Sequence, residues 1–277
     1  MPLAAVVQLT SHSDESRCLA EAEAWVAKAA SNGATLVVTP ENTNYLGPHD
    51  EKVRRAETLD GPLVQRLGSW ARTHGIWLVI GSINERAEDP TRCYNTSLVF
   101  RPDGALVAHY RKMHLFDVDV SSDVRFKESD TVVPGNRPVT VDTDLGRLGL
   151  TICYDLRFPE MYRQLALNGA QLLCVPSAFT ARTGRDHLEP LLRARAIENQ
   201  CFVLAPGQVG HHDDGGLRHS HGHSMIIDPW GTVVATLSDE PGIALAEIDV
   251  AQVEQTRRAM PCFNHRKLGL TVPESPP

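Results

Sequence analysis

The chain has 277 residues, of which 42% are hydrophobic and 22% are charged, and its formal net charge is −7. This composition is typical of a globular protein that buries a sizeable core without disulfide staples. The acidic balance and the lack of any basic block argue against nucleic acid or an anionic membrane as a partner. No apolar stretch approaches the roughly 18 residues of a membrane-spanning helix, and the first residues lack the pattern of a signal peptide.

The first half of the chain predicts strands that alternate with helices. Apolar runs and helical periodicity indicate the strands 3–9, 35–39 and 76–81 and the helices 15–31 and 62–73. Two further strands, 95–100 and 105–111, are joined by Arg101-Pro102-Asp103-Gly104, which is a hairpin signal. Part of the sheet is therefore expected to be antiparallel.

The second half continues the alternation. Its expected elements are the strands 147–153, 171–176, 201–205, 223–228, 232–237 and 243–248 and the helices 158–168, 187–200 and 250–259. No linker-like stretch divides them, which favours one mixed α/β domain over residues 1–260. Residues 261–277 form a short tail whose apolar groups are predicted to pack at a subunit interface.

The six cysteines are widely spaced and include no C-x-x-C pair; they are Cys18, Cys93, Cys153, Cys174, Cys201 and Cys262. In a chain of this size, the pattern indicates reduced thiols in a cytoplasmic protein, not a disulfide framework or a zinc site.

Cys153 ends an apolar run that reads as a buried strand, and Phe158-Pro159-Glu160 reads as the start of a helix. A thiol at such a turn is presented near the positive end of a helix dipole, which favours the reactive thiolate. The alternative is a small buried hydrophobic residue, and for a cysteine taken alone this is the better interpretation.

Two more ionisable residues follow predicted strands. Glu41 comes after the strand 35–39, and Lys112 comes after the strand 105–111. Residues at strand ends point into the sites of layered α/β folds. Taken singly, each residue has a better non-functional interpretation, in which Glu41 is a solvated turn residue and Lys112 a surface cation.

The residues around these positions resemble the nitrilase superfamily of carbon–nitrogen hydrolases. The matching segments are Thr39-Pro40-Glu41, 110–116, Phe126-Lys127-Glu128-Ser129 and 152–160. The resemblance covers about residues 3–270. It implies a four-layer αββα sandwich with mixed sheets, a homodimer or larger homo-oligomer, and no metal or organic cofactor.

The resemblance also assigns roles. Cys153 is the nucleophile that forms a thioester, and Glu41 moves the proton to and from it. Lys112 and the backbone N–H of Tyr154 are the candidates for stabilising the oxyanion. Glu128 is expected to help hold the lysine and the substrate, against the alternative of a charged loop residue.

Within the superfamily, the chain resembles the amidases that act on deaminated glutathione, with the ω-amidases next. The segments that carry this are 112–119, 176–179, 191–201 and 222–231. They imply a terminal amide, or a related non-peptide C–N bond, in a small substrate that carries a carboxylate. One departure from the close relatives is Leu188, which stands where they usually have Trp and which puts the shape of the pocket in doubt.

A carboxylate in the substrate requires a cation in the pocket. Arg157 is predicted to clamp it, with an ion pair to Glu160 as an equal alternative; Arg182 and Arg185 are weaker candidates. Phe179 and Tyr45 are also predicted to contact the substrate, although Tyr45 could simply pack.

Other readings stay open. The histidine-rich segment 211–223 is interrupted by glycines, so a solvated flexible loop is predicted rather than a metal site. The alternative activities are ω-amidase on 2-oxoglutaramate, N-carbamoyl-amino-acid hydrolase and nitrilase. A catalytically silent binding member of the fold and a thiol redox protein that uses Cys153 are the alternatives of other classes.

Overall fold

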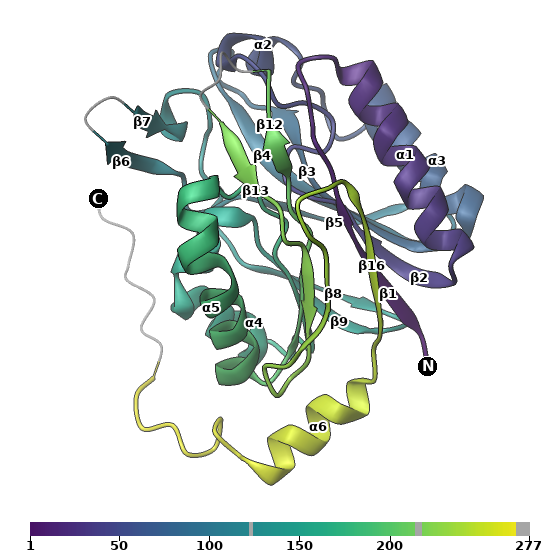
Figure 1. Cartoon of the computed structure of the whole chain (residues 1–277), viewed down its shortest axis with the longest axis vertical. Helices are drawn as coiled ribbons and strands as arrows, with labels where there is room; N and C mark the ends of the chain where they lie inside the picture. The colour runs from purple at the N-terminus through teal and green to yellow at the C-terminus, as the bar shows by residue number, and fades with distance from the viewer. Residues whose placement is uncertain (122–123, 214–217, 270–277) are drawn as a thin grey trace.

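In the computed structural model, which describes residues 1–121, 124–213 and 218–269, two six-stranded sheets lie at the centre of the molecule (Figure 1). The first sheet has the order β16 (Gly242–Glu247), β1 (Leu3–Gln8), β2 (Ala34–Val38), β3 (Trp77–Arg86), β4 (Cys93–Phe100) and β5 (Leu106–Arg111). Strands β1, β2 and β3 run parallel to one another, whereas β16, β4 and β5 pair antiparallel with their neighbours. The first sheet is therefore mixed.

The second sheet has the order β15 (Val233–Thr236), β14 (Met225–Ile227), β11 (Phe202–Ala205), β10 (Leu172–Cys174), β9 (Gly146–Leu150) and β8 (Val139–Thr143). Its central strands β9, β10 and β11 are parallel, and the outer strands are antiparallel to their neighbours. The strands β10 and β11 are buried throughout, which is typical of strands covered on both faces.

Alternation along the strands explains the layers. On β1, Ala5 and Val7 pack with the helices α1 (Glu15–Ser31) and α3 (Pro62–His74), whereas Ala4 and Val6 face a second core shared with the other sheet. Successive side chains of a strand point to opposite faces, so each apolar strand serves two cores. The helices α4 (Pro159–Leu167) and α5 (Ala181–Asn199) cover the second sheet (Figure 1). The predicted αββα sandwich is confirmed.

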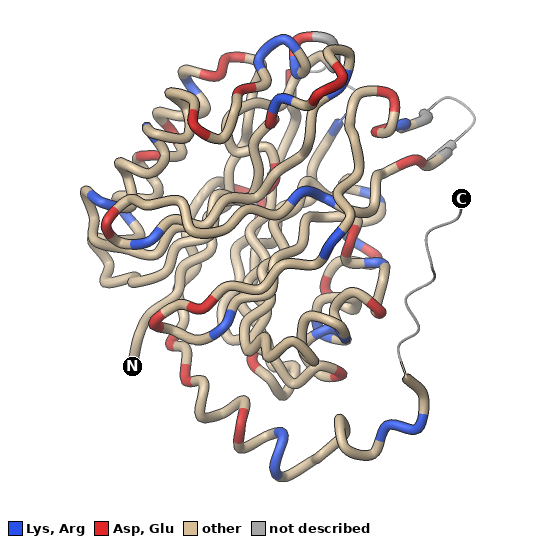
Figure 2. Tube along the Cα trace, turned by 180° about the vertical axis from the view of Figure 1, so that it is seen from behind, with Lys and Arg blue, Asp and Glu red and all other residues tan. Residues whose placement is uncertain are grey.

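The remaining elements lie outside the four layers. They are α2 (His49–Arg54), the hairpin β6 (Asp117–Ser121) and β7 (Val124–Lys127), the hairpin β12 (Val209–His211) and β13 (His219–His221), the helix α6 (Val250–Ala259) and the 3₁₀ helices η1 (Glu128–Asp130) and η2 (Cys153–Arg157). Lys and Arg are interspersed with Asp and Glu along the chain (Figure 2). None of the helices in the described parts has the length and apolarity needed to cross a membrane.

Most of the predicted elements are present, with shifted ends. The predicted strand 147–153 ends at Leu150, and Cys153 has a positive φ of 49° and begins η2. Helix α5 begins at Ala181 rather than at 187, because the side chain of Thr180 caps it by accepting the N–H of Thr183. Helix α2, strand β8 and both small hairpins were not predicted.

The tail turns back on the chain's own helices. Phe263 lies between two guanidinium groups, 4.9 Å from that of Arg163 on α4 and 5.1 Å from that of Arg257 on α6. Residues 270–277, the rest of the predicted tail, lie outside the described residues.

Candidate active site

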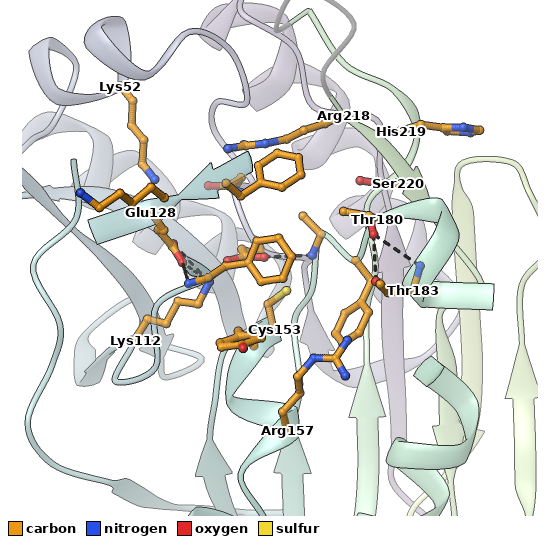
Figure 3. Close-up of a pocket in the computed structure, with 18 residues that line it drawn as sticks. Lys52, Lys112, Glu128, Cys153, Arg157, Thr180, Thr183, Arg218, His219 and Ser220 are labelled. Carbon is orange, nitrogen blue, oxygen red and sulfur yellow. Dashed lines mark hydrogen bonds and ion pairs between the residues drawn. The ribbon is translucent and has the colours of Figure 1, made fainter. Parts of the chain in front are cut away.

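Four of the predicted catalytic side chains meet at one cavity (Figure 3). Glu41 follows β2, Lys112 follows β5, Glu128 begins η1, and Cys153 begins η2 after β9. Glu41 and Lys112 follow strands of the first sheet, Cys153 follows a strand of the second, and Glu128 follows the hairpin β6–β7, so segments more than 100 residues apart meet here. The sequence prediction that these residues share a site agrees with this geometry.

Glu41 is almost fully buried and makes a hydrogen bond through each oxygen. Its Oε1 accepts from the Nζ of Lys112 at 2.9 Å and from the Nδ2 of Asn95 at 2.9 Å. Its Oε2 accepts the backbone N–H of Ala178 at 2.9 Å. Three donors therefore fix the carboxylate in one orientation, beside the thiol of Cys153.

Lys112 is 2% exposed and lies between two carboxylates. Besides Glu41, its Nζ donates to Glu128 Oε2 at 2.9 Å and to Oε1 at 3.1 Å. Burial acts to lower the pKa of Lys112, but the charges of Glu128 and Glu41 outweigh it and hold that pKa well above its ordinary value. Burial acts to raise the pKa of Glu128, and the Lys112 ammonium reverses this and holds it well below its ordinary value. Both groups are charged at neutral pH.

The thiol of Cys153 differs from the sequence expectation of a stabilised thiolate. Burial raises its pKa well above the ordinary value, and the negative charge of Glu41 raises it further, against a smaller opposing effect of Lys112. The resting group is therefore a thiol. A nucleophilic attack from this position requires that a base take the proton, and the Glu41 carboxylate, which lines the same cavity, is the candidate.

The turn that carries Cys153 is held from several sides. Its backbone N–H donates to the carbonyl of Pro176 at 2.8 Å. The fully buried Asp155 accepts from the hydroxyl of Tyr110 at 2.7 Å and from the backbone N–H of Ile152 at 2.8 Å. The guanidinium of Arg195 donates to the carbonyl of Leu156 at 2.7 and 3.2 Å.

Sequence reasoning missed three of the supporting residues, namely Asn95, Asp155 and Arg195. Asp155 stands inside the segment 152–160 that matches the superfamily, so its position was visible but its role was not. For Asn95, the signal is a run of three polar residues in a strand that is otherwise apolar. A buried polar side chain needs partners, and here the partners are the two glutamates of the site.

The side chains above the thiol form an aromatic and cationic wall. The guanidinium of Arg157 lies 5.8 Å from the ring of Tyr154 and 5.6 Å from that of Phe179, and all three line the cavity. Its nitrogens lie 3.4 and 3.5 Å from Nδ1 of His187. Among the described residues, Arg157 makes no ion pair with Glu160, so the arrangement favours the substrate-clamp interpretation.

The weaker cation candidates lie elsewhere. Arg182 and Arg185 are not among the residues that line the cavity, and Arg185 pairs with Asp186 at 3.1 Å on the surface. Leu188, the departure from the relatives, is buried behind Phe179, where both line a second, smaller cavity.

The structure corrects the prediction that Tyr45 contacts the substrate. It is 2% exposed and does not line the cavity. Its hydroxyl donates to the carbonyl of Pro48 at 3.3 Å, and the guanidinium of Arg55 lies 5.2 Å from its ring. Tyr45 therefore packs inside its own loop and does not reach the substrate.

The prediction of a solvated flexible loop for the histidine-rich segment is also corrected in part. In its described residues, it forms the hairpin β12–β13, and His212 is buried, with its Nδ1 2.8 Å from the carbonyl of Ser11 and its Nε2 2.8 Å from the hydroxyl of Ser220. The rings of His211 and His219 stack at 4.1 Å across the hairpin. The described parts of the chain contain no group of three potential metal ligands. Residues 214–217 lie outside the described residues.

Comparisons with known proteins agree with the geometry. The family model "Carbon-nitrogen hydrolase" matches residues 3–258. A deaminated glutathione amidase from Synechocystis is 43% identical over 267 residues, which cover 95% of this chain and 97% of that protein.

Two solved structures extend the comparison. Saccharomyces cerevisiae Nit3, a member of branch 10 of the nitrilase superfamily, has a TM-score of 0.86 and 34% identity over 96% of this chain and 97% of its own. A mutant amidase from Nesterenkonia sp. AN1, with acrylamide added at its active-site cysteine, has a TM-score of 0.78 and 28% identity over 95% of this chain and 99% of its own.

Proposed function

The chain belongs to the carbon–nitrogen hydrolase family, as an amidase of the nitrilase superfamily, and from that premise we propose that it hydrolyses deaminated glutathione through a thioester at Cys153. The observation that carries this proposal is the position of the Glu41 carboxylate, which lines one cavity with the Cys153 thiol and accepts a hydrogen bond from the Lys112 ammonium at 2.9 Å. This arrangement supplies a nucleophile, its base and a positive charge at one point.

The first half of the reaction forms the thioester. Glu41 takes the thiol proton, and the sulfur of Cys153 adds to the amide carbon. The negative charge that develops on the carbonyl oxygen is stabilised by the ammonium of Lys112 and the backbone N–H of Tyr154. Glu41 then returns the proton to the leaving nitrogen, the C–N bond breaks, and the amine departs.

The second half releases the acid. Glu41 removes a proton from a water molecule, whose oxygen adds to the thioester carbon, and the C–S bond breaks with return of the proton to sulfur. Glu128 is held ionised by Lys112 and so keeps the ammonium charged and in place through both halves. The whole cycle uses only groups of the chain and water.

The acyl end of the substrate is the second part of the proposal. In deaminated glutathione, the scissile amide joins a 2-oxo diacid to cysteinylglycine. Arg157 presents a planar guanidinium four residues after the nucleophile, which suits a bidentate contact with the 2-oxo acid carboxylate. The same clamp would accept 2-oxoglutaramate, which keeps ω-amidase as the second candidate.

Release of amine or ammonia from four substrates tests the proposal: deaminated glutathione, 2-oxoglutaramate, an N-carbamoyl amino acid and a simple nitrile. We expect the highest kcat/KM on deaminated glutathione and no turnover by Cys153→Ala. Preference for the nitrile or the carbamoyl compound would overturn the substrate assignment alone. Equal turnover by Cys153→Ala would overturn the mechanism, and absence of turnover on all four would favour the silent binding member.

We also propose the setting of the enzyme. Residues 1–260 act as one catalytic domain, the tail from 261 lies at a subunit interface, and the protein is a homodimer or larger homo-oligomer. The six free thiols, five of them buried, support the reducing cytoplasm as its compartment. Light scattering of the full chain and of a chain ending at residue 260 tests the assembly. A monomeric full chain would contradict the proposed homo-oligomer.

A further inference from the structure

The cations of the cavity lie on two sides of the nucleophile (Figure 3). Arg157, the last residue of η2, lies on one side. On the other side, Lys52 reaches from α2 toward Glu128, and Arg218 extends from the start of β13 across the cavity toward the side of Lys52. Cys153 lies between the two groups of cations. A substrate that carries charge only at its acyl end would pair with the cations on one side and make no ion pair with those on the other.

The charge of the lining is unbalanced. Five cationic side chains and two carboxylates line the cavity, in a chain whose formal net charge is −7. Glu41 and Glu128 share the ammonium of Lys112, so only one of the other four cations is needed to balance the second carboxylate. The surplus positive charge near the opening therefore favours an anionic ligand with more than one acidic group.

Lys52 differs from the other two lysines of the cavity. Lys112 is bound by two carboxylates, and Lys127 pairs with Asp130 at 2.8 Å. In the described parts of the chain, the ammonium of Lys52 makes no ion pair or hydrogen bond, although the residue is half-buried. After Lys112, it is the second positive charge that lowers the pKa of Glu128 against the effect of burial, and its side chain reaches toward Glu128 (Figure 3). A partly desolvated ammonium of this kind gains from an anion supplied by a ligand.

We propose that Lys52, together with Arg218 from the same cavity lining, binds a carboxylate on the leaving-group side of the scissile amide. This inference rests on the proposed function, because the acyl group stays attached to Cys153 and its far end is assigned to Arg157. The cations on the opposite side then face the part of the substrate that departs. The substrate class is an amide with an acid at each end, whose leaving amine is an amino acid or short peptide rather than ammonia.

The rival hypothesis is that Lys52 affects catalysis only through its charge near Glu128 and does not bind the substrate. A comparison of substrates distinguishes the two hypotheses. Three substrates share the same acyl part: deaminated glutathione, its analogue with a C-terminal carboxamide, and 2-oxoglutaramate. Only the first has a leaving group with a carboxylate. An effect through Glu128 must appear with all three, whereas a subsite affects the first alone.

The experiment compares kcat and KM for these substrates in wild type, Lys52→Met and Lys52→Arg. Arg54→Met is the matched control, because it removes one positive charge from the same helix at an exposed position outside the cavity. We expect Lys52→Met to lower kcat/KM for deaminated glutathione about tenfold, mainly through KM, as loss of one charge-pair contact does. The other two substrates should change less than about twofold, and Lys52→Arg should keep most of the activity.

Three results would overturn the subsite. They are an equal loss on all three substrates, no loss on any, and a wild type that does not distinguish the acid from the carboxamide. Absence of wild-type turnover on all three would instead overturn the proposed function, and the subsite with it.

Discussion

The floor and the rim of the cavity differ in how their charges are matched. On the floor, the buried ammonium of Lys112 lies 2.9 Å from the buried carboxylate of Glu41 and 2.9 Å from that of Glu128, which is largely covered. On the rim, Arg157 lies over two aromatic rings beside a histidine, and Lys52 makes no ion pair or hydrogen bond within the described residues. The charges of the floor therefore already form ion pairs within the protein, whereas charges of the rim can pair with a bound ligand. Chemistry is therefore expected to depend on the floor and substrate choice on the rim.

The largest effect is expected for the base of the floor. Glu41→Gln keeps the size of the side chain but cannot take the thiol proton, and its amide nitrogen cannot accept the N–H of Ala178. We expect kcat to fall by about 10³-fold, in the range found for loss of general acid–base catalysis. Steady-state kinetics check this, with the thermal unfolding temperature as the measure of folding. A variant that keeps a tenth of the activity would show that Glu41 is not the base.

The second prediction concerns stability. A carboxylate whose pKa is lower in the folded chain stabilises the fold above its unfolded pKa of about 4.3, and the contribution is lost as the pH falls toward the folded value. Glu128 is such a group. Glu128→Gln should lower the free energy of unfolding by about 3 kcal/mol at pH 7, because it removes one partner of a buried ammonium.

Urea unfolding at pH 7 and at pH 3 measures this effect. The difference between wild type and Glu128→Gln should shrink at pH 3, where wild type has lost part of the same contribution. Asp130→Asn is the control, since Asp130 lies in the same 3₁₀ helix and forms an exposed pair with Lys127. A difference that stays constant between the two pH values would contradict the lowered pKa of Glu128.

The smallest of these effects belongs to the rim. Arg157→Met should raise KM for deaminated glutathione and 2-oxoglutaramate by about tenfold and leave kcat within a few-fold, because it removes a contact that ground state and transition state share. Arg185→Met, an exposed arginine paired with Asp186, is the control. A fall in kcat with unchanged KM would mean that Arg157 acts on the chemistry and that the division between floor and rim is wrong.

The sequence predicts the floor better than the rim, for a physical reason. Glu41, Lys112 and Cys153 each follow a strand or strand-like run that apolar patterning reveals, and packing of the two sheets brings these strand ends together. Glu128 follows the unpredicted strand β7, so only the resemblance located it. The thiolate expectation failed because local sequence carries no information on how deeply Cys153 is buried beside Glu41.

The rim depends on contacts between distant segments. Lys52 lies on a six-residue helix too short for a periodic signal. The hairpin that carries Arg218 is positioned by pairing of Ser220 with Thr180 and by the bond from the N–H of His221 to the carbonyl of Phe179 at 2.9 Å. The prediction for Tyr45 was wrong for the same reason. Its closeness to Glu41 in the sequence suggested that it lines the cavity, whereas its side chain packs within its own loop.

The measurement that tests the central claim most directly is the mass of the intact protein during turnover of deaminated glutathione, quenched in acid within the first turnovers. The account predicts that wild type gains the mass of the 2-oxo diacid acyl group, that fragmentation places this group on Cys153, and that Cys153→Ala gains none. Active wild-type enzyme that shows a burst of amine release but no added mass, or an acyl group on another residue, would contradict the claim that Cys153 is the nucleophile.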